Sequence, residues 1–376
     1  MHASRRTWQQ RLLPRIGAAI IATGIAFGFC EIAARMIFPP PPIGTRQPQV
    51  AYLYDPEIRY VLRPNQKSWI DDGLITVNSQ GFRGPEAPSR KPEGSFRIVV
   101  IGDSLTLGWG VADNETFSAR LEQLLRDHFP GQDLDVLNLG VGGYNTRQEV
   151  TFLTRKLRIL RPDVVLLGFY ANDVPDALED EGGSGTRIVP RNRRPGEVMY
   201  INPTPSGWWH TQLRKSRAIF VVGRAVNRLR GAGDWGRAEF NLELDLLAGK
   251  TSPQLERAWG RVSMELQRLR SLAIANGFRV AVVVLPCREQ VTGENPNRSY
   301  QSRVRAIGAP LGFHVIDPLP MMTASQARKV DLFIPYDRNH PSAEGHALIA
   351  QAIVRDLDQN GIVASTAKPS RATTRQ

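Results

Sequence analysis

Four polar positions in this sequence carry side chains that together could transfer an acyl group. Ser104 supplies a hydroxyl, His340 a proton-transferring ring and Asn172 an amide N–H donor. Asp337 stands three residues before His340, so its carboxylate can reach the ring Nδ1 and leave Nε2 free toward a serine. The paired glycines at 142–143 could add a backbone N–H donor. A nucleophile, a base with an orienting acid and donors for an oxyanion are the components of covalent acyl transfer.

Three of these positions follow apolar runs that predict buried parallel strands. The predicted strands are 96–101, 135–139, 163–169, 279–285 and 313–316, with helices at about 117–128 and 146–160 between the first three. This alternation predicts an α/β fold of three layers, α/β/α, in which a mainly parallel five-stranded sheet lies between helices. Ligands of such sheets bind beyond the carboxyl ends of the strands, where Ser104, Gly142–Gly143 and Asn172 fall.

Each residue also has an ordinary structural interpretation. Gly-Asp-Ser is a common turn, Asn172 with Asp173 could cap a helix, and His340 is one of six histidines. His346 is the nearby competitor of His340, but it falls within the last predicted helix and lacks an acid three residues earlier. Asp103 is expected to hold its loop by accepting backbone N–H bonds, since adjacent side chains on a turn diverge. The joint order of the blocks favours chemistry over these alternatives.

The blocks resemble those of the SGNH, or GDSL-type, hydrolase superfamily. They read Gly102-Asp103-Ser104-Leu105, Asn138 through Gly143, Ala171-Asn172-Asp173 and Asp337-Arg338-Asn339-His340-Pro341. The resemblance covers about 96–357 and implies a flavodoxin-like fold with Ser104 as nucleophile and Asp337 and His340 as the other triad members. It implies an oxyanion hole made of the Ser104 N–H, the Asn172 amide and a backbone N–H of the second block. Spacing from Asn138 favours Gly143 over Gly142 as that last donor.

The first 40 residues predict a membrane segment. Arginines at 5, 6, 11 and 15 precede an apolar stretch at 16–38, which as a helix would cover roughly 34 Å against about 30 Å of hydrocarbon. The positive-inside rule places residues 1–15 in the cytoplasm, which predicts a single-pass inner-membrane protein with a periplasmic catalytic domain. Glu31 and Arg35 can pair at the outer end of the span. A cleaved signal peptide, suggested by Ala26-Phe27-Gly28, and a buried soluble helix are the alternatives.

The rest of the chain changes several times in composition and in the spacing of its apolar residues. They predict a proline-rich spacer at 39–50, a small β-rich prelude at 51–95, a hydrolase domain at 96–360 and a disordered tail at 361–376. The segment Asn78–Gly84 of the prelude also looks like that of membrane-anchored bacterial members of the superfamily. An insertion at about 176–255 interrupts the hydrolase domain and contains a basic helix near 212–230. This helix could pack on a core with a solvated basic face, or contact a membrane surface or polysaccharide.

The amino-acid composition limits the classes of partner that the protein could bind. The formal charge of +12 favours anionic partners, but no zinc-finger spacing or RNA-binding aromatic motif accompanies it, so we expect no nucleic acid. The only two cysteines, Cys30 and Cys287, argue against a disulfide framework or a cysteine metal site, and we expect neither metal nor organic cofactor.

These features together predict a serine-type carboxylester hydrolase that acts outside the cytoplasm through an acyl-serine intermediate. The expected substrate is an ester-bearing small molecule, lipid or acylated glycan. One alternative is an O-acyltransferase or deacetylase acting on a cell-surface or exported polysaccharide, because a sugar hydroxyl can replace water at the same acyl-serine. A second alternative is a membrane-anchored binding protein that keeps the fold and has lost catalysis.

Overall fold

The computed structural model describes most of the chain and divides it into two compact units. The described residues are 3–40, 46–88, 90–178, 193–200, 213, 215–229, 237–326, 330–335 and 337–363. One unit comprises 1–45 and 205–234, and the other comprises 46–204 and 235–376. The predicted spacer at 39–50, tail at 361–376 and insertion at 176–255 each fall partly outside the described residues.

The larger unit is built on a parallel sheet of five strands in the order β10-β9-β7-β5-β6. Its strands are β5 (Phe96–Gly102), β6 (Leu134–Asn138), β7 (Val164–Phe169), β9 (Arg279–Val284) and β10 (His314–Ile316). In the register of the central strands, Val100 pairs with Leu166 and Leu166 with Ala281. Every side chain of β5 and β7 is buried, as expected for strands covered on both faces. All five strands lie where the sequence predicts them.

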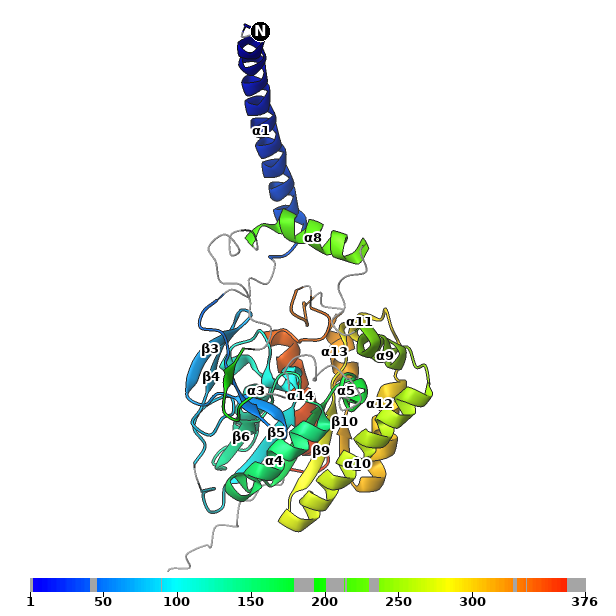
Figure 1. Ribbon diagram of the computed structural model, residues 1–376. Coiled ribbons are helices and arrows are strands. Elements are labelled where there is room, and N and C mark those ends of the chain that lie inside the picture. The colour runs from blue at the N-terminus through cyan, green and yellow to red at the C-terminus, as the bar shows by residue number, and fades with distance from the viewer. Residues whose placement is uncertain are drawn as a thin grey trace, which may run out of the picture. The chain divides into compact units, whose positions relative to one another are not determined.

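Helices cover both faces of this sheet (Figure 1). On one face α3 (Phe117–His128) packs against α14 (Ala343–Gln359), and on the other α4 (Thr146–Leu160) packs against α10 (Pro253–Asn276). Shorter helices are α2 (Ser104–Leu107), α5 (Asp173–Asp176), α9 (Arg237–Leu247), α11 (Arg288–Thr292), α12 (Ser299–Gly308) and α13 (Leu319–Gln326). The predicted three-layer α/β/α architecture is confirmed.

Residues 46–88 add antiparallel strands to the same unit. The strands β1 (Tyr52–Asp55) and β2 (Arg59–Leu62) pair with each other, and β3 (Gln66–Ile70) pairs with β4 (Gly73–Val77). The free edge of β1 pairs with β8 (Val198–Met199), which belongs to the predicted insertion. The sequence indicates β structure here, but it does not predict β8, because two residues carry no alternating pattern.

Tyrosines join the prelude to the sheet. The Tyr60 ring lies 5.4 Å from that of Tyr52 and 5.5 Å from that of Tyr144, which precedes α4. The Tyr144 hydroxyl donates to the Tyr60 carbonyl, and Gln148 Nε2 donates to the Ile58 carbonyl at 3.0 Å. The three rings are buried, so the prelude shares its core with the sheet.

The described residues of the smaller unit include the helices α1 (Ala3–Ile37) and α8 (Arg217–Leu229). Within α1, the 26 residues Leu12–Ile37 are apolar and long enough to cross a membrane, and none of the most apolar stretch is buried. A signal sequence near an N-terminus has the same length and composition. The helix begins well before the predicted span at 16–38, because the basic N-terminal residues continue it without a break.

Candidate active site

Ser104 lies at the carboxyl end of β5, in a tight turn into α2. A Cβ at Gly102 would come within 2.1 Å of Thr106 Oγ1, so this close approach requires glycine. Asp103 caps α2, because its Oδ1 accepts the N–H of Leu105 at 2.9 Å. The buried Asp103 therefore holds the turn, as the sequence predicts, and leaves Ser104 partly exposed.

The loop before α14 places His340 and Asp337 in a row with Ser104. His340 Nε2 lies 2.8 Å from Ser104 Oγ, and His340 Nδ1 lies 2.8 Å from Asp337 Oδ2. The second oxygen, Oδ1, accepts the backbone N–H of Asn339 at 2.8 Å and that of His340 at 2.9 Å. The structure thus brings together the three residues that the sequence selects, and it leaves Nε2 directed at the serine.

The charges in this row suit proton transfer. Burial raises the pKa of Asp337, but the charge and hydrogen bonds of His340 outweigh it and lower that pKa to about 2. Burial lowers the pKa of His340, yet nearby carboxylates, Asp337 above all, more than offset it, and the pKa of His340 rises above its ordinary value. An ionised Asp337 therefore makes His340 a stronger base for the serine proton.

The loop after β6 brings its glycines alongside the serine. A Cβ at Gly142 would lie 3.8 Å from Ser104 Cβ, and the Gly142 carbonyl accepts the Tyr60 hydroxyl at 2.9 Å. Because a trans peptide points its C=O and N–H in opposite directions, the Gly143 N–H faces away from Tyr60. Gly143 has φ +76°, which favours glycine. In the described chain, neither the Ser104 nor the Gly143 N–H donates to a backbone carbonyl, so both are open to an acceptor.

Asn172 follows β7 and stands at the first turn of α5. Its Nδ2 lies 3.2 Å from Asp103 Oδ2 and 3.4 Å from Asp176 Oδ2. The bond to Asp103 places the amide next to the nucleophile turn, while the bond to Asp176 is long and can be exchanged. Asn172 occupies the N-cap position of α5, as the alternative interpretation expects, but its side chain makes no capping bond to the helix.

Trp109 and Asp71 form a wall of the site that the sequence does not indicate. The Trp109 ring stacks on the His340 ring, with centroids 5.7 Å apart and planes at 27°. Its Nε1 donates to Asp71 Oδ2 at 2.5 Å, and Asp71 lies in the turn between β3 and β4. Burial raises the pKa of Asp71, and its carboxylate in turn raises that of His340. The prelude therefore reaches the catalytic histidine through one indole ring.

Arg83 holds the loop that follows the nucleophile. Its Nη1 donates to the carbonyls of Leu107 and Gly108, and its Nη2 to that of Val111, each at 2.7 Å. Its Nε donates to Asp113 Oδ1 at 2.9 Å. Arg83 is 3% exposed and belongs to the segment Asn78–Gly84, whose likeness to anchored relatives was the available signal.

Arg288, at the start of α11, fastens the loop that carries the acid and base. Its Nε donates to the Asp337 carbonyl at 2.9 Å and its Nη2 to the Ile334 carbonyl at 2.7 Å. Its backbone N–H donates to the Arg338 carbonyl at 3.2 Å. No sequence motif identifies Arg288, because its hydrogen-bond partners are backbone carbonyls, which every residue has.

His346 does not belong to the site. It is fully buried on α14, where its Nδ1 accepts the Phe117 N–H at 3.1 Å and its ring stacks on that of Phe117. Burial lowers the pKa of His346 to about 3. It is a neutral core histidine, as its position within the last helix predicts.

Asp173 ties two elements beneath the oxyanion region. Its Oδ2 accepts the Tyr170 N–H at 2.9 Å and its Oδ1 accepts the Thr146 hydroxyl at 3.0 Å. These bonds connect the end of β7 with the start of α4, whereas the sequence indicates Asp173 only as part of a helix cap. Within the described ranges, no group of three or more His, Cys, Asp or Glu side chains is placed to hold a metal ion.

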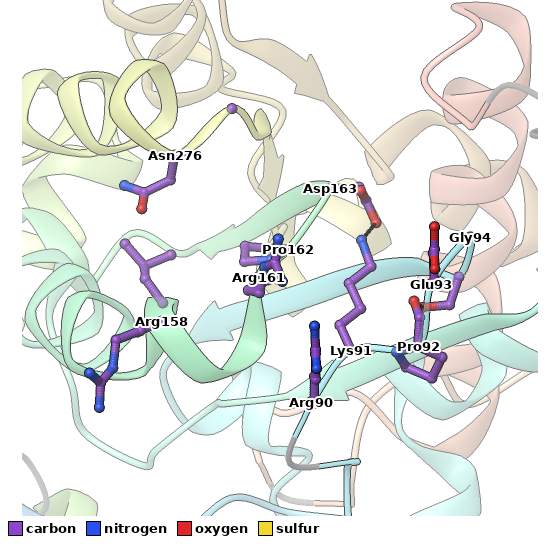
Figure 2. Close-up of a pocket in the computed structure, with 13 residues that line it drawn as sticks. Arg90, Lys91, Pro92, Glu93, Gly94, Arg158, Arg161, Pro162, Asp163 and Asn276 are labelled. Carbon is purple, nitrogen blue, oxygen red and sulfur yellow. Dashed lines mark hydrogen bonds and ion pairs between the residues drawn. The ribbon is translucent and has the colours of Figure 1, made fainter.

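A surface pocket of about 1100 Å³ lies away from these residues (Figure 2). Its lining includes Arg90, Lys91, Arg161 and Asp163, which precede β5 or β7 and therefore adjoin the amino ends of the strands. Lys91 and Asp163 form an ion pair across it. None of the predicted site residues lines this pocket, so it is separate from the catalytic edge.

The site has a serine, a histidine and an aspartate in a row at the carboxyl edge of a parallel sheet, beside N–H groups that are free to donate. This is the arrangement of an α/β serine hydrolase. The profile of the GDSL-like lipase/acylhydrolase family matches residues 100–348, and the chain belongs to this family.

Individual relatives are distant. An arylesterase of Vibrio mimicus is 32% identical over 85 residues, which cover 23% of this chain and 42% of that protein. The chain thus matches less than half the length of this curated relative. Similar solved structures include LAE5, an alpha/beta hydrolase from the metagenome of Lake Arreo, Spain, at 14% identity and TM-score 0.43, covering 70% of this chain and 96% of that one. TesA is also similar, at 14% identity and TM-score 0.40, covering 70% and 98%.

Proposed function

We propose that this protein is a serine carboxylester hydrolase that forms an acyl intermediate on Ser104. The observation that supports it most directly is the row from Ser104 Oγ through His340 to Asp337, with both hydrogen bonds at 2.8 Å. The proposed substrates are ester-bearing small molecules, lipids or acylated glycans, in keeping with the ester hydrolysis of the family.

In the proposed reaction, His340 Nε2 takes the Ser104 proton as Oγ bonds to the ester carbonyl carbon. The carbonyl oxygen becomes an oxyanion that accepts the Ser104 and Gly143 N–H groups and the Asn172 amide. His340 then gives its proton to the alcohol as the C–O bond breaks, leaving an acyl-serine. A water molecule then loses a proton to His340 as its oxygen bonds to the acyl carbon. His340 returns that proton to Ser104 Oγ as the bond between Oγ and the acyl carbon breaks and the acid leaves. Asp337 stays ionised and stabilises the imidazolium in both halves.

A fluorophosphonate probe tests the nucleophile directly. We expect the wild type to be labelled and to hydrolyse p-nitrophenyl acetate, and Ser104→Ala to lose both. Ser271→Ala, at an exposed position on α10, is the matched control and should keep both. An unlabelled wild type would contradict the proposal and favour a binding protein. An acylated sugar in place of free acid, when a sugar acceptor is present, would indicate an O-acyltransferase.

We also propose that α1 anchors the protein as a single span of the inner membrane, with its N-terminus in the cytoplasm and the catalytic unit in the periplasm. Support comes from the apolar segment Leu12–Ile37 and from the arginines that precede or begin it. Protease added to spheroplasts should digest the catalytic unit, whereas protease added to intact cells should not. Intact mass spectrometry of the mature chain checks the other alternative, since a cleaved signal peptide would remove the first 26 residues or more.

A further inference from the structure

Helix α8 has two chemically different faces. At 100° per residue, Ile219, Val222 and Val226 fall on one face, and Arg217 and Arg224 on the opposite one. Ile219 is 38% and Val222 60% exposed, so the apolar face is uncovered within its own unit. The stretch from 212 to 230 has no acidic residue and six basic ones: Arg214, Lys215, Arg217, Arg224, Arg228 and Arg230.

Glu31 of α1 caps the start of α8. Its Oε2 accepts the Ser216 hydroxyl at 2.7 Å and the Ala218 N–H at 3.0 Å, and its Oε1 accepts the Arg217 N–H at 3.2 Å. These are N–H groups that the first turn of a helix leaves without intrahelical partners. Arg35 Nε donates to the same carboxylate at 2.8 Å. A side chain of one helix therefore fixes the first turn of another, and α8 lies across the end of α1 (Figure 1).

The position of Glu31 along α1 determines how deep in the bilayer the start of α8 would lie. Glu31 stands six residues before Ile37, the last residue of the apolar segment, or about 9 Å along the helix axis. Interfacial helices bury their apolar face about 5–10 Å into the boundary between headgroups and acyl chains. An acid inside an apolar segment is costly unless it is paired, and this carboxylate is fully hydrogen-bonded. The cap thus places the start of α8 at the depth of an interfacial helix.

We infer that α8 is an interfacial helix that docks on the surface of an anionic phospholipid bilayer. Ile219, Val222 and Val226 enter the acyl boundary, and the arginines of the opposite face attract anionic headgroups. The inference rests on the proposed membrane anchor, because the end of α1 brings α8 to the membrane. Packing on the hydrolase core, the other interpretation of the helix at 212–230, would leave a label at position 222 unquenched in the experiment below.

Depth-dependent quenching tests this placement in the full-length protein. The chain is reconstituted in vesicles of phosphatidylethanolamine and phosphatidylglycerol, with an environment-sensitive fluorophore on Val222→Cys in a Cys30→Ser background. The buried Cys287 does not compete for the label, because burial raises the pKa of its thiol to about 12. We expect shallow nitroxide lipids to quench the label at 222, and to quench a label on Arg224→Cys, the matched position on the polar face, much less.

Two further measurements separate this inference from the anchor itself. A label on the native Cys30, which is exposed on α1, reports insertion of the span. Quenching at Cys30 without quenching at 222, or equal quenching at 222 and 224, would overturn the placement of α8 and leave the anchor intact. Absence of quenching at Cys30 would overturn the anchor. Loss of the cap in Glu31→Ala should lower the ratio of docked to undocked α8 about fivefold without changing Cys30.

Discussion

The carboxyl edge of the parallel sheet and the prelude at 51–95 serve one site in different ways. The sheet edge and the loop before α14 carry the groups proposed to react, among them Ser104 and His340. The prelude carries side chains that hold those groups in place, through Tyr60, Asp71 and Arg83. The groups that react must be one of a few residue types and must lie at the ends of strands. A residue that only positions these groups can come from any segment close enough to hydrogen-bond to them. The comparison predicts that sheet-edge changes abolish turnover and that prelude changes lower it in graded steps.

The largest effect belongs to the sheet edge. Asn172→Ala removes one proposed oxyanion donor, and we expect kcat to fall by about 10²–10³ with little change in thermal stability. Steady-state kinetics with p-nitrophenyl acetate and a thermal melt check both. Asn276→Ala, at the exposed end of α10, is the matched control. Near-normal kcat in Asn172→Ala would remove the residue from the oxyanion hole.

The next largest effect is expected at Arg83, where a substitution should lower both activity and stability. Arg83→Met removes the guanidinium that donates to three backbone carbonyls and to Asp113, and we expect the free energy of unfolding to fall by about 3 kcal/mol. The loop after Ser104 loosens, so kcat should fall as well. Denaturant unfolding of this variant and of Arg63→Met, an exposed control in the prelude, measures the difference. Equal stabilities of the two variants would contradict the structural role of Arg83.

A smaller effect is expected at Tyr60. Tyr60→Phe keeps the buried ring and removes the hydroxyl that fixes the Gly142 carbonyl, at a cost of about 1 kcal/mol. Because the same peptide presents the Gly143 N–H, kcat should fall about tenfold while KM changes little. Tyr200→Phe, at an exposed tyrosine, is the control. A change confined to KM would show that the Tyr60 hydroxyl does not act through the oxyanion donor.

The smallest effect is a shift in pH dependence. His340 must be unprotonated to take the serine proton, and its pKa is raised, so activity is lost as pH falls through that raised value. Asp71→Asn removes a negative charge that raises this pKa and keeps an acceptor for Trp109 Nε1. The acid limb of kcat/KM should therefore move to lower pH. Asp72→Asn, next to it and paired with Arg46, should leave the limb in place, and a shift in both variants would make the effect nonspecific.

The sequence predicts the two regions unequally for a physical reason. Apolar runs long enough to be buried on both faces identify all five strands of the sheet, and Ser104, Asp337 and His340 stand where acyl transfer requires them. Residues such as Arg288 and Tyr60 bind backbone carbonyls, which every residue offers, so no sequence pattern distinguishes them. The strand β8 is set by pairing with β1 across a long separation in the chain, and its two residues carry no periodicity of their own.

The chain crosses between its two compact units three times, at residues 45/46, 204/205 and 234/235. A single proteolytic cut between α1 and the prelude therefore leaves two covalent connections, both through the segment that bears α8. With α8 docked as inferred, such a cut does not shed the catalytic unit, and cell fractionation should find its activity in the membrane pellet. Signal-peptidase cleavage near Ala26–Gly28 would likewise leave Glu31 attached to the mature chain. The enzyme would then meet its substrates by lateral diffusion over the membrane surface.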